Sequence, residues 1–215
     1  FYFSHHITSG EGGLITCKNK KDYEVLLALR SHGWARDIKL HRKQLTNKFN
    51  EKFEFVNLGY NLRSTDISAA LLINQIPKIN KFKNIRLKNY KLLKTGLSKN
   101  KNLKENLHFV NSEKNAEASW FGFPLILKKK LSKHRNKIAE TLDQNGIQTR
   151  PIISGNFTEQ PVMKDLGLNF RKGNLTTSSY IHKAGFFIGM SSVPISKQKV
   201  KKIVSVFEKV FLSFI

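Results

Sequence analysis

The sequence predicts an α/β chain in which strands alternate with helices after residue 100. Apolar residues recur at helical spacing near the C-terminus. The residues that share this face are Val200, Ile203, Val204, Phe207 and Val210. Short apolar runs at residues 120–127 and 184–188 are typical of buried strands. Polar segments rich in lysine, asparagine and glycine separate these runs and mark the connections.

Before residue 100 the pattern predicts mostly helix. The expected elements are, in order, a short strand at residues 14–17, a helix at 22–32, a long basic loop at 34–53, and helices at 67–76 and 80–97. Gly33 ends the first helix, and the Ser64-Thr65-Asp66 segment caps the second. Pro77 kinks or separates the last two helices, because proline lacks the backbone N–H that a helix interior needs.

After residue 98 strands dominate. The expected elements are a polar link at residues 98–106, strands at 108–110, 120–127, 147–153 and 184–188, and helices at 132–145 and 196–211. Ser132 is expected to cap the first of these helices, and Gly146 ends it. A domain boundary is expected near residues 85–100, with a long helix crossing it.

The composition excludes several classes of protein. With 215 residues, the chain forms one large domain or two small ones. No run approaches the roughly 20 apolar residues of a membrane helix, so we expect no membrane partner. The single cysteine, Cys17, excludes an intramolecular disulfide and is expected to be a small core residue. The chain opens without Met or a signal-peptide pattern, so we expect a fragment or a processed chain.

The net charge of +23, from 38 Lys and Arg against 15 Asp and Glu, raises the question of nucleic-acid binding. The lysines are spread along the whole chain, and no RNA-binding aromatic motif, zinc finger or helix-turn-helix signature accompanies them. We therefore predict no nucleic-acid partner. The charge helps to attract an anionic substrate but remains largely unexplained.

Several short motifs occur in an order that resembles one enzyme family. They are Phe1-Tyr-Phe-Ser-His-His6, Gly10-Glu-Gly-Gly13, Leu29-Arg-Ser-His-Gly33, Gly59-Tyr-Asn-Leu-Arg63, Gln75-Ile-Pro-Lys-Ile79, Gly146-Ile-Gln-Thr-Arg-Pro151 and Ser154-Gly-Asn-Phe-Thr158. Together they resemble the DegT/StrS-type sugar aminotransferases, which use pyridoxal 5'-phosphate (PLP). No single motif is specific, but the matches run from residue 1 to about residue 190.

The resemblance implies a fold-type I, aspartate aminotransferase-like α/β fold. Residues 1–90 would be the C-terminal part of the large PLP-binding domain, and residues 91–215 the small α+β domain. The N-terminal half of the family pattern is absent from this sequence. The resemblance also implies a homodimer with shared active sites, in the cytoplasm.

His5 is the informative departure from the family pattern. The aminotransferases carry at this position the lysine that forms a Schiff base with PLP, which an imidazole cannot form. The family's nucleotide-sugar 3-dehydratase branch carries Ser-His-His instead. It uses PLP and pyridoxamine 5'-phosphate, with L-glutamate as amino donor, to remove the C3 hydroxyl of a nucleotide-linked 4-keto-6-deoxy sugar. Its products serve deoxysugar and lipopolysaccharide O-antigen biosynthesis.

Three alternatives stay open: an inactive homologue, a sugar aminotransferase relative, and a basic α/β binding module without enzymatic activity. A related iron–sulfur branch of the family is disfavoured. Its extra cysteines lie in the loop after the Leu-Arg helix, and residues 34–53 contain none.

The resemblance assigns roles around the cofactor. His5 is the expected catalytic base, because a free imidazole titrates near neutrality. Ser4 contacts the cofactor, and His6 either serves the site or packs beside it. His32 reaches the active site of the neighbouring subunit, or else caps the helix end. Asn61 contacts the cofactor phosphate of the partner subunit.

The substrate side is assigned in the same way. Arg63 is expected to hold the glutamate carboxylate, a bidentate role suited to guanidinium, or else to form a surface ion pair. Arg150, Asn156 and Phe157 are expected to face the nucleotide sugar. The histidines left as structural or exposed are His41, His108, His134 and His182. No metal site is expected, because the adjacent His5 and His6 rarely converge on one ion.

Overall fold

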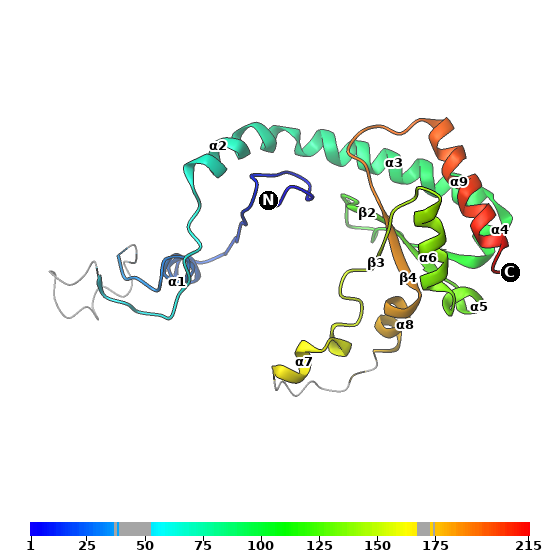
Figure 1. The fold of residues 1–215 in the computed structure, drawn as a ribbon. Helices are drawn as coiled ribbons and strands as arrows, with labels where there is room; N and C mark the ends of the chain where they lie inside the picture. Colours follow the sequence, from blue (N-terminus) through cyan, green and yellow to red (C-terminus); the bar gives the residue numbers. More distant parts are fainter. Residues whose placement is uncertain (37, 39–52, 167–172, 174) are drawn as a thin grey trace. The chain divides into compact units, whose positions relative to one another are not determined.

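The computed structural model describes residues 1–36, 38, 53–166, 173 and 175–215 (Figure 1). Internal packing divides the chain into unit 1, Phe1–Lys78, and unit 2, Ile79–Ile215. The division after residue 90 that the family resemblance implies stays a prediction. Most of the loop expected at 34–53, with His41, lies outside the described residues.

Among its described residues, unit 1 contains two helices, each capped at its N-terminus by a side chain. Helix α1, Lys20–Arg30, is capped by Asn19, whose side chain accepts from the backbone N–H of Asp22 at 2.8 Å. Helix α2, Asp66–Gln75, is capped by Thr65 as predicted. The 3-10 helix η3, Ile76–Lys78, carries Pro77 and separates α2 from the next helix, which confirms the expected break.

Two predictions in unit 1 are wrong. Residues 14–17 are extended but form no strand, because no ladder partner lies beside them among the described residues. Leu14 and Ile15 are 76% and 72% exposed. Cys17 is an exposed free thiol and not a core residue. Apolar composition alone therefore overestimated the burial of this segment.

Unit 2 is built on a four-stranded antiparallel sheet. Its strands are β1, Leu107–Phe109, β2, Gly122–Leu127, β3, Thr149–Pro151, and β4, Gly185–Gly189, in the spatial order β1-β2-β4-β3. All four were predicted close to these positions. Gly122 pairs with Gly189, and a side chain at Gly122 would meet the Phe187 ring at 2.3 Å. The glycine therefore lets the Phe187 ring lie across β2.

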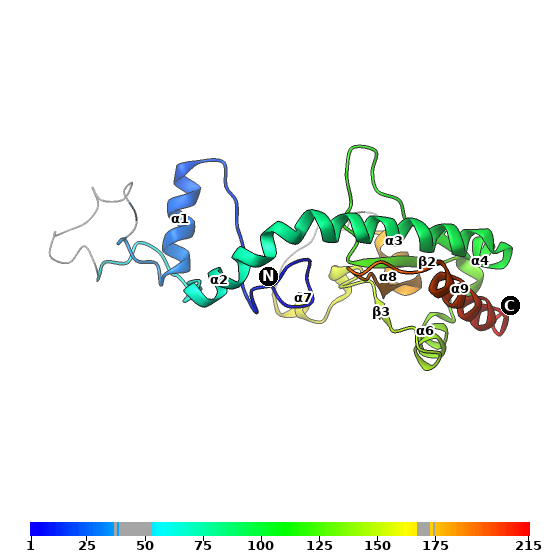
Figure 2. The same cartoon turned by 90° about the horizontal axis from the view of Figure 1, so that it is seen from above.

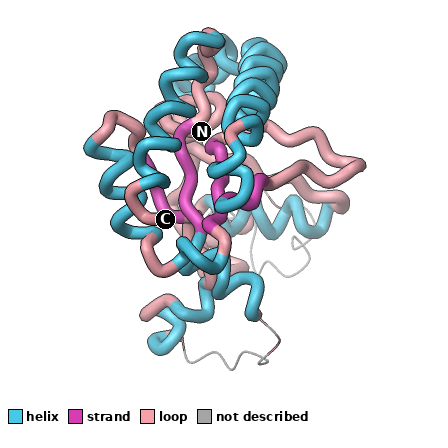
Figure 3. The backbone as a smooth tube through the Cα atoms, turned by 90° about the vertical axis from the view of Figure 1, so that its right-hand side faces the viewer, coloured by secondary structure: helices cyan, strands magenta, loops and turns pink. Residues whose placement is uncertain are grey.

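Helices surround this sheet (Figure 3). The helices of unit 2 are α3, Ile79–Lys99, α4, Lys101–Asn106, α5, Lys129–Ser132, α6, Arg135–Gln144, η4, Phe157–Glu159, α7, Val162–Asp165, α8, Thr176–Ala184, and α9, Lys197–Leu212. Of these, α7 lies away from the sheet, beyond β3 (Figure 1). The predicted helices near residues 80–97 and 196–211 correspond to α3 and α9. The core lies between the sheet and these helices and includes the fully buried residues Leu97, Phe123, Leu125, Phe207 and Phe211.

Two predicted features of unit 2 are corrected. The polar link at 98–106 is largely helix α4, because Asn100 caps this helix and its Leu103 side chain is fully buried. Ser132 does not cap a long helix. It is the last residue of the short helix α5, and α6 begins at Arg135 after His134. The sequence interpretation also missed η4, α7 and α8.

A long loop, residues 110–121, projects from unit 2 between β1 and β2 (Figure 2). Four contacts tie it to α3, one of them a hydrogen bond from Lys94 Nζ to Asn111 Oδ1. Lys83 forms a salt bridge with Glu117 at 2.8 Å. The Tyr90 ring stacks on Trp120 with centroids 4.1 Å apart, and the Tyr90 hydroxyl donates to the carbonyl of Val110. The loop is therefore held at both ends by the same helix.

Burial raises the pKa of Tyr90 to about 12. A raised pKa of the folded state means that the neutral phenol stabilises the fold below the ordinary tyrosine pKa. This contribution is lost as the pH rises toward 12. We expect the 215-residue chain to show a late-titrating tyrosinate absorbance that Tyr90→Phe reduces, while Tyr180, whose pKa burial also raises, keeps a part of it. An unchanged late phase in this variant would contradict the assignment, and Tyr23→Phe, at an exposed site, is the matched control.

Candidate active site

Residues 1–12 fold into a closed loop. Ser9 N–H and Thr8 Oγ1 donate to the carbonyl of Phe1 at 2.9 and 3.1 Å, and Tyr2 pairs with Gly10 in a parallel bridge. Gly12 has a φ of +143°, and a side chain there would approach Ser9 Oγ at 3.0 Å. The glycine-rich motif therefore closes the loop.

Ser4 and His5 occupy the exposed part of this loop, and His6 is half-buried. The backbone N–H of His5 donates to the carbonyl of Tyr2 at 3.0 Å. The two rings meet edge to face with centroids 5.9 Å apart. This arrangement presents the His5 imidazole at the surface of the loop. The nearest lysine in the sequence, Lys18, lies beyond the loop.

A second element forms where the segment after α1 pairs with residues 54–62. His32 N–H donates to the carbonyl of Tyr60 at 2.8 Å. Gly33 has a φ of +86°, and a Cβ there would lie 1.7 Å from the carbonyl oxygen of Asn57. Only glycine fits this close backbone approach. The Leu-Arg-Ser-His-Gly motif thus sets the path of the chain around His32.

This pairing brings three predicted site residues into one element. Ser31, next to His32, forms an antiparallel bridge with Asn61. Arg63 Nε donates to Asn61 Oδ1 at 3.1 Å. Ser31 is the C-cap of α1, so the alternative role of His32 as the helix-end cap is not what the geometry shows. Asn61 and Arg63 are exposed, and both can reach a ligand.

Within unit 1, His5 and His32 are carried by separate elements. Figure 1 shows the N-terminal loop and α1 apart, joined by the extended segment near residues 13–18. One copy of unit 1 therefore presents two groups of site residues: Ser4, His5 and His6 in the first, and His32, Asn61 and Arg63 in the second.

The third group lies in unit 2, in the loop that follows β3. Ser154 and Gly155 have φ values of +64° and +52°. A side chain at Gly155 would meet His182 Nδ1 at 2.2 Å, so the loop lies directly against His182. The backbone N–H of Asn156 donates to the same Nδ1 at 3.3 Å. His182 therefore helps to hold this loop in place.

The Asn156 side chain is 5% exposed, and its hydrogen bonds are made within the protein. Its Nδ2 donates to Glu159 Oε1 and to Ser179 Oγ, both at 2.9 Å. Its Oδ1 accepts from Thr158 N–H and Oγ1. These four hydrogen bonds use both donor and both acceptor positions of a carboxamide. The geometry favours a positioning role for Asn156, which leaves its neighbour Phe157 51% exposed.

Glu159 completes this network. Hydrogen bonds from Ser179 and Asn156, and the nearby His182 and Lys183, hold the pKa of its carboxyl below the ordinary value. Ser179 Oγ donates to Glu159 Oε1 at 2.6 Å. A lowered folded-state pKa means that the ionised carboxylate stabilises the loop above the ordinary pKa. This contribution is lost as the pH falls through the folded-state pKa.

Asn156→Ala is expected to lower the free energy of unfolding by about 1–3 kcal/mol, because buried donors and acceptors lose their partners. It should also make residues 154–160 more sensitive to proteolysis. Urea denaturation and limited proteolysis measure both effects. The matched control is Asn136→Ala, at an exposed position of α6. Equal behaviour of the two variants would contradict the network's role.

The remaining residues named in the sequence analysis lie outside these three groups. Arg150 is exposed on β3. His108 is exposed, and His134 packs against Phe214 with ring centroids 5.6 Å apart. Over the described ranges, no group of three or more His, Cys, Asp or Glu side chains is arranged to hold a metal ion. Nor do these ranges include a helix with the length and apolar character needed to cross a membrane.

Sequence reasoning missed Asn89, Glu159 and Ser179. Glu159 and Ser179 lack a motif of their own and act only through Asn156. The buried position of Asn89 could have been recognised from the sequence. Asn89 interrupts the apolar face that α3 presents with Tyr90, Leu93 and Leu97, and it is itself 1% exposed.

Comparisons with known proteins agree with the fold. The solved structure described as E coli GDP-4-keto-6-deoxy-D-mannose-3-dehydratase with bound hydrated PLP has a TM-score of 0.81 and 30% identity, covering 96% of this chain and 52% of that one. Another structure of the same kind of enzyme, with a trapped PLP-glutamate geminal diamine, has a TM-score of 0.81 and 30% identity, covering 96% of this chain and 53% of that one. The predicted aminotransferase-like α/β fold is confirmed.

The family follows from the sequence comparison. The model of the DegT/DnrJ/EryC1/StrS aminotransferase family matches residues 1–208. The chain belongs to this family, as its motifs predicted. The GDP-4-keto-6-deoxy-D-mannose 3-dehydratase of Yersinia pseudotuberculosis is 33% identical over 213 residues, which cover 97% of this chain and 52% of that protein. The chain thus spans about half the length of the relatives that it matches.

Proposed function

We propose that this chain forms the C-terminal half of a PLP-dependent nucleotide-sugar 3-dehydratase. In this reaction an NDP-4-keto-6-deoxyhexose loses its C3 hydroxyl, and L-glutamate supplies the amino group. The observation that carries the proposal is His5, which lies exposed on a closed loop where the family's aminotransferases have lysine. The similarity to enzymes named 3-dehydratases over nearly the whole chain supports it.

The residues present fit one part of a cofactor site. Ser4 and Asn61 offer an exposed hydroxyl and an exposed amide that can hold the phosphate of PLP or pyridoxamine phosphate. When bound, the cofactor would supply the amino group and the electron sink. His5 offers an imidazole that takes up and returns a proton and cannot bond covalently to the cofactor aldehyde as lysine does.

The other residues complete the proposed assignment. Arg63, held by Asn61 through its Nε, keeps its terminal nitrogens available for the glutamate carboxylate. The ordered 154–157 loop presents Phe157 to the nucleotide sugar, with Arg150 nearby in the sequence. Because His5 and His32 lie on separate elements, a homodimer in which His32 serves the partner's site suits this chain. The proposed location is the cytoplasm, and the proposed role is deoxysugar and lipopolysaccharide O-antigen biosynthesis.

Unit 1 needs further polypeptide to become such a site. Helix α2 buries none of its residues, and Ile67 and Ile73 are exposed on it. Leu58, beside the His32 element, is 96% exposed. Exposed apolar surface of this extent marks an interface. We infer that the rest of the family fold covers it, and that the 215-residue chain alone binds PLP poorly.

The test is an assay of the protein extended to the full family length. With PLP, L-glutamate and GDP-4-keto-6-deoxy-D-mannose, we expect a 3-deoxy-4-keto sugar and release of ammonia. Formation of an amino sugar would instead favour the aminotransferase alternative. Absence of both products, in a folded protein that binds PLP, would favour the inactive homologue. Micromolar binding of PLP by the 215-residue chain alone would contradict the inferred dependence on further polypeptide.

A further inference from the structure

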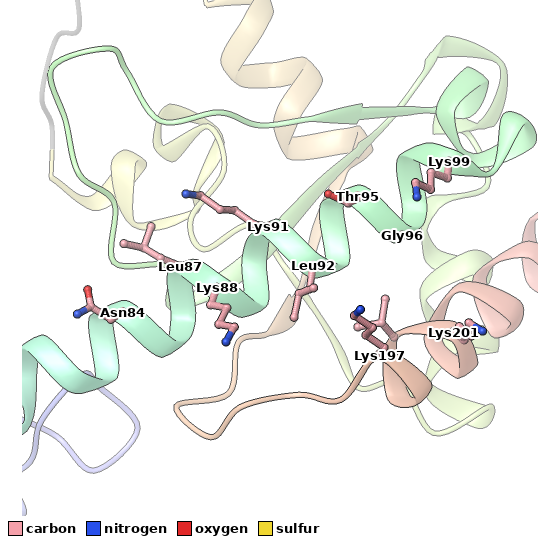
Figure 4. Close-up of a pocket in the computed structure, with 11 residues that line it drawn as sticks. Asn84, Leu87, Lys88, Lys91, Leu92, Thr95, Gly96, Lys99, Lys197 and Lys201 are labelled. Atoms are coloured by element: carbon pink, nitrogen blue, oxygen red, sulfur yellow. The ribbon is translucent and has the colours of Figure 1, made fainter.

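Helices α3 and α9 of unit 2 enclose a groove that the proposed reaction does not use. Figure 4 shows Lys88 and Leu92 projecting from α3 on the side of α9, where Lys197 and Lys201 project from the first turns of α9. The groove has a volume of about 710 Å³. Gly96 sets the approach of the helices, because a Cβ there would lie 2.7 Å from Val200 Cγ1.

The lining of the groove is apolar below and cationic at its rim. Leu92 and Val200 contribute the apolar surface. Lysines stand on both sides, and these are Lys88, Lys91, Lys99, Lys197 and Lys201. All five are exposed, and among the described residues none of them forms an ion pair. The rim thus concentrates positive charge that no carboxylate of the described chain neutralises.

The positive charge at the rim destabilises the two helices that carry it. Helix α3 has no acidic residue, and α9 has none in its first turn, where Lys197 and Lys199 lie. Cations at a helix N-terminus oppose the helix dipole, and neighbouring lysines repel each other. A partner that brings negative charge to the rim would relieve this repulsion.

We propose that the α3–α9 groove docks an acidic amphipathic helix of a partner protein. An apolar stripe on such a helix would cover Leu92 and Val200, while flanking Glu and Asp residues would meet the lysines on both rims. A second copy of this chain is a poor occupant, because its net charge is also +23. Nucleic acid is disfavoured because the lining contains no aromatic side chain or arginine. A flat bilayer would not reach apolar residues that lie below a rim of lysines.

The probe is a labelled synthetic peptide of about 15 residues, with leucines on one helical face and glutamates on either side of them. Its binding to the protein extended to the full family length is measured by fluorescence anisotropy. We expect saturable binding that weakens with added salt. A peptide of the same composition, scrambled so that the leucines share no face, should bind at least about tenfold more weakly. Equal binding of the two peptides would overturn the proposal.

The decisive variant reverses one lysine on each side of the groove, Lys88→Glu with Lys197→Glu. We expect its affinity for the peptide to fall at least about tenfold. The control, Lys130→Glu with Lys137→Glu, changes the net charge equally at exposed positions of α5 and α6. Equal losses in both variants would show a bulk charge effect and overturn the proposal. Tighter, Lys88- and Lys197-dependent binding of a DNA duplex or of phosphatidylglycerol vesicles would overturn it in favour of that ligand.

Discussion

Replacing His5 by lysine in the protein extended to the family length is expected to abolish most of the 3-dehydratase activity. Loss of a positioned general base typically costs about 10²- to 10⁴-fold in rate. Lysine at this exposed loop position would instead bond to the PLP aldehyde. We therefore expect a Schiff-base absorbance in His5→Lys that is absent from the parent protein. Steady-state ammonia release and the absorption spectrum measure the two effects.

Two further variants separate the base from the covalent bond. His5→Asn removes the base without adding an amine, so it should lose activity and show no Schiff-base absorbance. His108→Lys makes the same chemical change at an exposed residue of β1 and should leave both readouts unchanged. Full dehydration by either His5 variant would show that His5 is not the base.

The sequence was most informative where local signals decide the structure. Thr65 accepts a hydrogen bond from a backbone N–H three residues on, and it lies in the segment identified as a cap from residue type and position. Ser196 makes the same bond at the predicted start of the last helix. The strands β2 and β4 were recognisable because buried strands are apolar throughout. Helix periodicity likewise predicted the buried side of α9, where Val200, Phe207 and Val210 lie.

Long-range contacts explain the errors. The apolar residues at 14–17 resemble a strand, but a strand exists only beside a partner, and a single segment does not report its partner. The resemblance identified Asn156 as a site residue, yet whether its carboxamide faces a ligand or the protein depends on Ser179, 23 residues away. Tertiary packing decides that the Asn156 carboxamide faces the protein.

The same reasoning singles out Asn89, which joins α3 to the segment after β4. Its Nδ2 donates to the carbonyls of Ser191 and Val193 at 3.0 and 2.9 Å, and its Oδ1 accepts from Ile195 N–H at 3.1 Å. This segment has no regular secondary structure. Its backbone groups therefore depend on Asn89 for their hydrogen bonds.

Asn89→Leu is expected to lower the free energy of unfolding by about 3 kcal/mol or more, because three backbone groups lose their partner and each unsatisfied group costs about 1–3 kcal/mol. Added apolar burial offsets part of this loss. Urea denaturation followed by circular dichroism measures it, and proteolysis within residues 191–195 should accelerate. Asn84→Leu, at an exposed position of the same helix, should change stability by less than about 0.5 kcal/mol. Matching stabilities of the two variants would show that hydrogen bonds from Asn89 do not hold this segment in place.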